Sequence, residues 1–303
     1  MRERRHRLPL PLGDEVPFSK GLMARALVVT GLDPERAYLI ARRADRDLVE
    51  RGVVSLDLDR LGELASELIG EEEAARTVRR LRRIDALQRL DEPLLLLVGG
   101  ATGTGKSTIA TEAAHRLGIT RVTSTDFIRQ TMRTFFSKEF MPSVHYSSFE
   151  ARLALTRAEE DESGDAAILG FLDQTRNVLV GVDAALERAA AERWSIVLEG
   201  VHLVPGMVDV SYPGAFVVQC VVAIEDENLH RSHFWVRDHA TEGLRPLEKY
   251  LDSLAQIREI QDYLVERARR HDVPVIYNDS LDNAVGDVLD LVLRRADQLV
   301  GVA

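Results

Sequence analysis

The feature of this sequence that most limits its fold is the stretch LLLLVGGATGTGKST at residues 94–108. Its apolar first part predicts a buried strand, and the residues from Lys106 onwards predict a helix. Between the two, Gly100, Gly105, Lys106 and Ser107 match the pattern G-x-x-x-x-G-K-[ST]. Between a strand and a helix, this pattern is typical of a phosphate-binding loop, whereas a chance glycine-rich turn would not explain all three features together. We therefore expect an α/β domain that binds a nucleotide.

The residues of this loop suit a nucleoside triphosphate. Glycines let the backbone turn so that successive N–H groups point inward at an anion, and the start of the following helix adds its positive end. Lys106 can reach the β- and γ-phosphates of ATP, and Ser107 can coordinate Mg²⁺. The expected ATP-binding residues are Gly100, Gly103, Thr104, Gly105, Lys106, Ser107 and Thr108.

From residue 94 onwards, strand patterns alternate with longer helical patterns. The strand segments are apolar without strict alternation, which is typical of strands covered on both faces. Alternating strands and helices predict a parallel sheet flanked by helices. The expected strands are residues 94–98, 120–125, 195–199, 215–224 and 273–278, and the expected helices are residues 106–117, 127–137, 149–160, 166–193, 246–270 and 283–298.

The N-terminal part of the chain reads as a block of short helices. Apolar stripes at helical spacing are separated by capping residues and glycines. Asp33 and Pro34, for example, begin a helical segment that ends at Gly52. The segment RLPLPLGDEVPF, which comes before this block, is compatible with a hairpin or an extended arm.

These patterns divide the chain into three parts. Residues 1–13 form a basic tail that we expect to be solvated and partly disordered. Residues 14–90 form the small, mostly helical domain, and residues 91–303 form the nucleotide-binding α/β domain.

The composition excludes several classes of protein. A net charge of -10 argues against a protein whose main partner is a nucleic acid. No apolar run approaches the roughly 20 residues that a membrane-spanning helix needs, and the basic N-terminus lacks the apolar core of a signal peptide. The one cysteine, Cys220, has no partner for an internal disulfide. We therefore expect a cytoplasmic protein with neither nucleic acid nor membrane as a partner.

The end of the second expected strand carries a candidate site for a phosphoryl acceptor. Asp126 comes at the carboxyl edge of the sheet, beside the phosphate loop if the second strand lies near the first. Its carboxylate can orient an acceptor hydroxyl and take its proton. Arg129 and Arg133 follow at i+3 and i+7 and share a helix face with it, which indicates an anionic substrate. The alternative is that Asp126 is an ordinary helix N-cap and that both arginines are solvated.

The end of the third expected strand carries two further candidates. Glu199 stands at the strand terminus, where an acidic side chain can bind the water shell of Mg²⁺. His202 follows three residues later, and it is either a substrate contact or a packed histidine.

Two connections complete the expected site. Ser147 and Ser148 lie in a hydroxyl-rich segment after the Asp126 helix, where they contact substrate or cap a helix. Residues 226–245 follow the fourth strand and are expected to form a lid. In such a lid, Arg231 and Arg237 would neutralise charge on the transferred phosphoryl group. The alternative is a charged surface helix, and the histidines of this segment lack the companion ligands of a metal site.

Several stretches together resemble the 2-phosphoglycerate kinase family. They are VPFSKGLMARALVVTGLDPERAYLIAR, GGATGTGKSTIATEAAHRLGI, TSTDFIRQTMR, HYSSFEA, GFLDQTRNVLVGVDAALERA and IVLEGVHLVPG, and the resemblance runs from about residue 14 to the C-terminus. It implies a P-loop kinase core after an N-terminal domain similar to an ATP-cone, in which Lys20 would contact a phosphate. It also implies transfer of a phosphoryl group from ATP to 2-phospho-D-glycerate, a small phosphorylated acid, which gives 2,3-bisphosphoglycerate.

Two other functions stay open from the residues alone. One is a kinase of another small anionic metabolite, which would differ only in the acceptor that gives turnover. The other is a P-loop regulatory switch with slow ATPase activity, although a switch needs no acceptor site such as Asp126 with its arginines. The sequence carries no signal for the oligomeric state.

Overall fold

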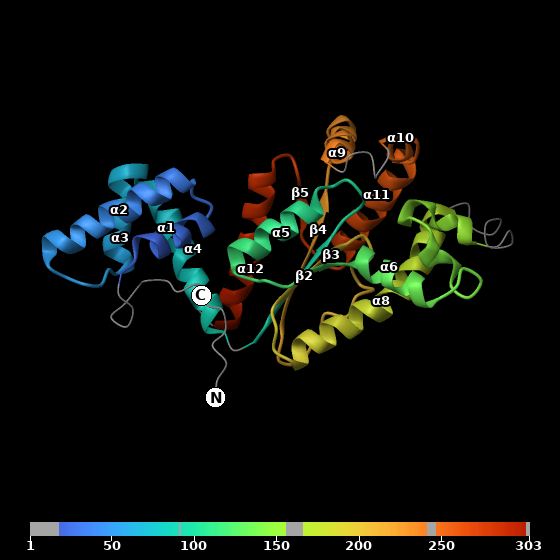
Figure 1. The fold of residues 1–303 in the computed structure, drawn as a ribbon, viewed down its shortest axis with the longest axis horizontal. Coiled ribbons are helices and arrows are strands. Elements are labelled where there is room, and N and C mark those ends of the chain that lie inside the picture. The colour runs from blue at the N-terminus through green and yellow to red at the C-terminus, as the bar shows by residue number, and fades with distance from the viewer. Residues whose placement is uncertain (1–17, 91, 156–165, 241–246, 301–303) are drawn as a thin grey trace. The chain divides into compact units, whose positions relative to one another are not determined.

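The computed structural model describes residues 18–90, 92–155, 166–240 and 247–300, and these fall into two compact units (Figure 1). The first unit contains the N-terminal helices, residues 115–118 and the last helix from Leu289 onwards. The second unit contains the sheet and the helices around it. The predictions for the basic tail and for the segment before Phe18 lie outside the described residues.

The N-terminal helices begin and end at signals that are visible in the sequence. The carboxylate of Asp33 accepts hydrogen bonds from the backbone N–H groups of Glu35 (2.9 Å) and Arg36 (3.2 Å), and Gly52 ends the same helix with a φ of 66°. A left-handed residue at this point favours glycine. The helices are α1 (Lys20–Val29), α2 (Pro34–Arg51), α3 (Leu58–Ile69) and α4 (Glu71–Arg89).

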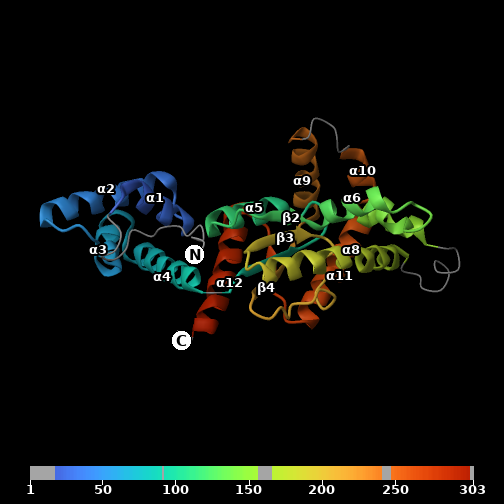
Figure 2. The same ribbon diagram turned by 60° about the horizontal axis from the view of Figure 1, so that its bottom comes forward.

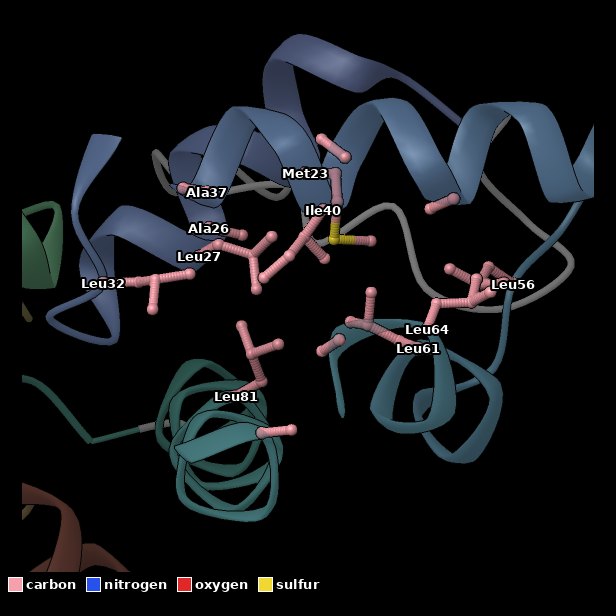
Figure 3. Close-up of a cluster of buried hydrophobic side chains, with 14 of the residues drawn as sticks. Met23, Ala26, Leu27, Leu32, Ala37, Ile40, Leu56, Leu61, Leu64 and Leu81 are labelled. Atoms are coloured by element: carbon pink, nitrogen blue, oxygen red, sulfur yellow. The ribbon is translucent and has the colours of Figure 1, made fainter. Parts of the chain in front are cut away.

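These helices surround one apolar core. Figure 3 shows Leu27 of α1, Ile40 of α2, Leu61 of α3 and Leu81 of α4 pointing toward one another. All four side chains are fully buried, and Leu293 from the last helix belongs to the same cluster. The apolar stripes of the sequence therefore meet in the interior of this unit, as amphipathic helices require.

The second unit is built on a five-stranded parallel sheet with the strand order β2-β3-β1-β4-β5. Because all strands run in the same direction, their carboxyl ends lie along one edge, where ligands bind in folds of this kind. The strands are β1 (Leu94–Gly99), β2 (Val122–Ser124), β3 (Ile196–Gly200), β4 (Phe216–Ala223) and β5 (Val275–Tyr277).

Helices flank this sheet, which confirms the expected fold class. Residues of α8 such as Val178 and Val182 pack with Leu97 of β1 and Leu198 of β3 in one buried cluster. Figure 2 shows α5 on one side of the strands and α8 on the other. The helices of this part are α5 (Lys106–Leu117), α6 (Thr125–Phe135), α8 (Ala166–Ala191), α9 (Glu227–Ala240), α10 (Leu247–Asp252), α11 (Leu254–Arg270) and α12 (Leu281–Val300), with the 3₁₀ helices η1 (Pro142–His145) and η2 (Ser148–Ala154).

The sequence did not predict the order of the strands, and in the structure β3 lies between β2 and β1. Two of the expected helices differ in the structure. The helix expected over 149–160 is described only as the 3₁₀ helix η2, and residues 156–165 lie outside the described ranges. The helix expected over 246–270 is two helices, α10 and α11, with Ser253 between them.

Strand β4 contains the chain's only cysteine. Cys220 is fully buried, and this burial raises the pKa of its thiol to about 12. None of the helices in the described ranges is long and apolar enough to cross a membrane.

Candidate active site

The phosphate loop follows β1 directly. Its glycines Gly100, Gly103 and Gly105 have φ angles of 149°, 88° and 81°, a region that favours glycine. A Cβ atom on Gly100 would also lie 2.5 Å from the carbonyl oxygen of Val222, so a side chain would not fit there. The loop leads into α5, whose first residue is Lys106. The motif therefore has the strand, turn and helix that the sequence predicts.

Lys106 and Glu199 face each other at the edge of the sheet. The Nζ atom of Lys106 lies 4.0 Å from Oε2 of Glu199 and 3.3 Å from the carbonyl oxygen of Ala101. The strand register brings this about, because Glu199 of β3 is paired with Val98 of β1. A lysine at this position can contact the phosphates of a nucleotide while it stays near a carboxylate that balances its charge.

The carboxylate of Glu199 fits a role in holding a divalent cation. Its Oε2 atom is buried and has no hydrogen-bond partner among the described residues, although a buried anionic oxygen normally needs one. Ser107 lies exposed at the start of α5 and offers a hydroxyl oxygen. No group of three or more His, Cys, Asp or Glu residues in the described ranges forms a dedicated metal cluster. An oxygen donor set with few protein ligands suits Mg²⁺, which keeps water and substrate phosphates in its shell.

Asp126 lies at the same edge of the sheet. Ser124, two residues before it, is paired with Glu199 in the register of β2 and β3. The side-chain hydroxyl of Ser124 accepts the N–H of Phe127 at 3.0 Å and is the N-cap of α6. The alternative that Asp126 is the N-cap is therefore wrong. Its side chain is 57% exposed, so the carboxylate is accessible to a ligand.

The guanidinium of Arg129 is buried and hydrogen-bonded within the protein, whereas a substrate contact needs an accessible guanidinium. Its guanidinium donates to Oδ1 of Asp126 through Nε (2.9 Å) and Nη2 (2.7 Å). Its Nη1 atom donates to the carbonyl oxygens of Val144 (2.8 Å) and Tyr146 (2.9 Å). The residue is buried, and all of these hydrogen bonds have protein acceptors. Arg129 therefore orients Asp126. Arg133, by contrast, is exposed, and its Nη1 atom lies 3.4 Å from Oε1 of Gln130.

His202 is a buried member of a hydrogen-bond network. Nε2 of Gln174 donates to the carbonyl oxygens of Ser143 (2.6 Å) and Tyr146 (3.0 Å). Its Oε1 atom must then accept from Nε2 of His202 (3.0 Å). Nδ1 of His202 consequently accepts the hydroxyl of Thr125 (2.8 Å). Both ring nitrogens are occupied, so the geometry favours the packed histidine over the substrate contact.

The environment of His202 keeps its ring neutral. Burial lowers the pKa of His202 to about 3, and the nearby positive charges of Arg129 and Lys106 act in the same direction. A neutral ring can donate at one nitrogen and accept at the other, which the network around Gln174 and Thr125 requires.

The connection from α6 to η2 is held in place by Arg129 and Gln174. Both side chains bind the carbonyl oxygen of Tyr146, and they also bind the carbonyl oxygens of the neighbouring residues. Ser147 follows directly and is half-buried, whereas Ser148 is buried. The structure therefore places Ser147 as the more accessible of the two expected serines.

The expected lid segment contacts the phosphate loop through residues that the sequence did not single out. Arg231 of α9 is exposed and ion-paired with Glu227 at 2.8 Å. His230 and His233 of the same helix instead bind carbonyl oxygens of the loop. The side chain of Arg237 lies outside the described ones, and so do residues 241–245 of the segment.

Three other residues were predicted to contact a nucleotide, namely Thr104, Thr108 and Lys20. The hydroxyl of Thr104 is buried and donates to the carbonyl oxygen of Ala101 (3.1 Å), so only its backbone can face a nucleotide. Thr108 is exposed on the first turn of α5. Lys20 of α1 forms a half-exposed ion pair with Asp45 at 3.0 Å, and its role as a phosphate contact stays a prediction.

Two residues of this region were not predicted from the sequence. They are Gln174 and Asn278, and the side chain of Asn278 donates to the carbonyl oxygen of Thr104. Neither residue belongs to a motif. His230 and His233 did carry a signal, since their i, i+3 spacing places them on one helix face. Which segment that face contacts depends on tertiary packing, because Thr102 and His230 are 128 positions apart.

Comparison with known proteins finds relatives over nearly the whole chain. The 2-phosphoglycerate kinase of Methanopyrus kandleri is 38% identical over 286 residues, which cover 93% of this chain and 85% of the relative. The 2-phosphoglycerate kinase of Methanothermobacter thermautotrophicus is 38% identical and covers 90% and 89%, respectively. That of Thermococcus kodakarensis is 37% identical and covers 94% and 95%. No protein-family model matches the chain.

Solved structures give weaker similarities. A gluconokinase from Sinorhizobium meliloti aligns at 16% identity and a TM-score of 0.37, covering 70% of this chain and 98% of its own. A shikimate kinase from Acinetobacter baumannii aligns at 16% identity and a TM-score of 0.34, covering 71% and 97%. Similarities at this level carry no argument about the site.

Proposed function

The chain belongs to the 2-phosphoglycerate kinase family, and we propose that it transfers the γ-phosphoryl group of ATP to the primary hydroxyl of 2-phospho-D-glycerate. The products are ADP and 2,3-bisphosphoglycerate. The observation that carries the proposal is the position of three side chains, Lys106, Glu199 and Asp126, at one edge of the parallel sheet.

In this proposal the donor half of the site is the phosphate loop. Backbone N–H groups and Lys106 bind the β- and γ-phosphates of ATP. Glu199 and Ser107 are the residues that would hold Mg²⁺, which when bound neutralises charge on the phosphate oxygens. Arg237 remains a proposed contact of the transferred group, and the ion pair of Arg231 with Glu227 would have to break for Arg231 to join it.

The acceptor half is centred on Asp126. Its carboxylate accepts the hydrogen bond of the primary hydroxyl and takes the proton as the new P–O bond forms and the bond from the γ-phosphorus to the leaving oxygen of ADP breaks. Arg129 holds the carboxylate in position through two hydrogen bonds. Arg133 is the exposed cation on the same helix, and it is suited to bind the carboxylate or phosphate of the substrate.

A kinase assay with identified products tests the proposal. The enzyme, ATP and Mg²⁺ would be combined separately with 2-phospho-D-glycerate, 3-phospho-D-glycerate and D-glycerate, and the products resolved by mass spectrometry and phosphorus NMR. We expect 2,3-bisphosphoglycerate from 2-phospho-D-glycerate, with the highest kcat/KM of the three. ADP release with 2-phospho-D-glycerate that does not exceed the ATPase background would overturn the proposal.

The same assay separates the alternatives. Turnover with a different small acid alone would indicate a kinase of another anionic metabolite. ATP hydrolysis that no acid changes would instead favour the regulatory switch, and Asp126 would then have no catalytic role.

A further inference from the structure

Three consecutive carbonyl groups of the phosphate loop are each bound by a side chain from elsewhere in the second unit. Two of the donors come from α9 and one from the residue after β5. We call these three side chains the carbonyl clasp. The bonds are His230 Nε2 to Thr102 (2.8 Å), His233 Nδ1 to Gly103 (3.0 Å) and Asn278 Nδ2 to Thr104 (2.9 Å).

The acceptors determine where the histidines carry their protons. A backbone carbonyl only accepts hydrogen bonds, so His230 must be protonated at Nε2 and His233 at Nδ1. His230 is fully buried, and its Nδ1 atom has no hydrogen-bond partner among the described residues. Burial lowers the pKa of His230, and the charges of Arg258 and Lys106 add to this effect. The buried histidine is therefore a neutral ring with one donor, which is used on the loop.

The clasp packs closely against the glycines of the loop. A Cβ atom on Gly103 would lie 2.5 Å from the ring of Phe234 and 2.9 Å from Nε2 of His230. A Cβ atom on Gly105 would clash with Nδ2 of Asn278. The rings of His230 and Phe234 stack with centroids 5.2 Å apart. These glycines are therefore needed for the approach of the clasp as well as for their backbone angles.

Holding a carbonyl also orients the next N–H group. In a planar trans peptide the C=O of one residue and the N–H of the next point in opposite directions. The clasp holds the carbonyls of residues 102, 103 and 104. It thereby turns the N–H groups of Gly103, Thr104 and Gly105 to the other side of the loop, which is the arrangement that binds an anion.

We propose that His230, His233 and Asn278 are positioning residues for ATP, because they hold the loop carbonyls away from the phosphates and point the following N–H groups at them. The proposal rests on ATP being the phosphoryl donor. It makes the first half of α9 a fixed support of the donor site.

The test compares variants that lose the donor with variants that keep it. His230→Leu removes the donor, whereas the amide of His230→Gln reaches a position similar to that of Nε2. His233→Leu and His233→Asn form the corresponding pair for Nδ1. Ser232→Ala, on an exposed residue of the same helix, is the control. The dissociation constant of ADP is measured by calorimetry on the full chain, and the KM values of ATP and of the acceptor are measured at saturating co-substrate.

Each leucine variant leaves a loop carbonyl without its donor. We expect about a tenfold rise in the dissociation constant of ADP and in the KM of ATP, consistent with the cost of an unsatisfied buried acceptor. The amide variants should return to within about threefold of wild type, and the acceptor KM should not change. His233 is only half-buried, so its pair keeps the test usable if His230→Leu does not fold.

Two results would overturn the proposal. One is equal ADP affinity in the leucine and amide variants. The other is a parallel rise of the acceptor KM and the ATP KM, which a general loss of structure would produce. Failure of the proposed function is distinguishable, since ADP binding is measured without any acceptor.

Discussion

Single charged side chains at the edge of the sheet carry out the proposed chemistry. In the proposed reaction Lys106 and Glu199 bind the donor, and Asp126 binds the acceptor; all three lie at one edge of the sheet. Glu199 and Asp126 stand within two residues of a strand end, and Lys106 follows the glycine loop after β1. Their roles can be tested one residue at a time.

Lys106→Ala should reduce kcat by about 10²–10³-fold, because it removes the ammonium group that we propose binds the β- and γ-phosphates of ATP. The fold should persist, since among the described residues the ammonium group donates one hydrogen bond, to the carbonyl oxygen of Ala101, and otherwise lies 4.0 Å from the carboxylate of Glu199. Steady-state kinetics and circular dichroism measure the two effects. Lys249→Ala, at an exposed lysine paired with Glu150, is the control and should keep kcat. A near-normal kcat in Lys106→Ala would contradict the role of the loop.

Asp126→Asn should lower kcat by about 10²-fold or more while the KM of ATP stays close to wild type. The amide cannot take the proton of the acceptor hydroxyl, although it can still accept hydrogen bonds from Arg129. Ser124→Ala serves as the matched control. It removes the N-cap of α6 and should cost about 1 kcal/mol of stability without changing kcat. If Asp126→Asn behaved like Ser124→Ala, Asp126 would have a structural role only.

At this scale the sequence predicted the types of residue but not all of their contacts. Lys106, Glu199 and Asp126 were identifiable because each stands at a strand end or in a motif. The contacts of Arg129 with the carbonyl groups of Val144 and Tyr146 were not, since they depend on how the connection after α6 folds back. Helix periodicity placed Arg129 on the right face, and tertiary packing then buried it.

Among the elements, helix α6 and the connection that follows it form the acceptor side of the proposed site. Gln174 of α8 and Arg129 of α6 hold this connection through its carbonyl groups. His202, on the segment after β3, completes the network through Thr125. The shape of the acceptor site therefore depends on three elements that are distant in sequence.

Gln174→Leu should raise the acceptor KM several-fold and leave the KM of ATP nearly unchanged. The leucine leaves the Nε2–H of His202 without its acceptor, at a cost of about 1–3 kcal/mol for the buried group. It also removes one donor from each of the carbonyl groups of Ser143 and Tyr146, which then keep only the N–H of Tyr146 and the guanidinium of Arg129. Steady-state kinetics with each substrate varied in turn measures the split. Arg176→Ala, at an exposed position on the same helix, is the control. Equal changes in both KM values would indicate that Gln174 only stabilises the fold.

The buried ring of His202 should make stability depend on pH. The pKa of His202 is about 3 in the folded protein and near 6.5 when the ring is exposed. Between these pH values the unfolded chain binds a proton that the folded chain does not, so stability falls as the pH falls below about 6.5. From pH 6.5 to pH 5 this residue alone should cost about 2 kcal/mol.

Urea unfolding of wild type and His202→Gln at both pH values measures this effect. The variant lacks the titrating ring, so it should lose less stability than wild type over the same interval. His230 titrates in both proteins, and its contribution cancels in the comparison. A loss of equal size in both proteins would contradict a buried neutral His202.

The sequence predicted the elements better than their arrangement. Apolar segments indicated all five strands, and the caps of α2 were visible as Asp33 and Gly52. The position of β3 between β2 and β1 was not visible, because buried strands of a parallel sheet have similar patterns and nothing local encodes their order. The break at Ser253 was also missed, since both flanking segments have helical periodicity.

On the scale of the whole molecule, the two units pose separate questions about nucleotide binding. The second unit contains the phosphate loop, and the first contains Lys20 on α1. The resemblance to an ATP-cone predicts that the first unit binds a nucleotide of its own. In the structure Lys20 forms an ion pair with Asp45. A bound phosphate would have to replace Asp45 as the partner of Lys20.

Calorimetry with ATP can separate the two units in the full chain. If the first unit binds nucleotide, Lys106→Ala should keep residual ATP binding, and adding Lys20→Ala should abolish it. Lys106→Ala with Arg25→Ala is the control, because Arg25 is an exposed cation on the same helix. If the variant with both Lys106→Ala and Lys20→Ala still bound ATP, Lys20 would not be a nucleotide contact.

Because the chain has a single cysteine, the response of α9 to nucleotide can be followed by fluorescence spectroscopy. Cys220 is buried in β4 and its pKa is about 12, so its thiol is almost entirely protonated at neutral pH and shielded from reagents. A cysteine introduced on the surface, such as Ser232→Cys on α9, would therefore be the one site that takes up a maleimide dye. The native chain thus serves as its own background for fluorescence measurements that follow α9 while nucleotide is added.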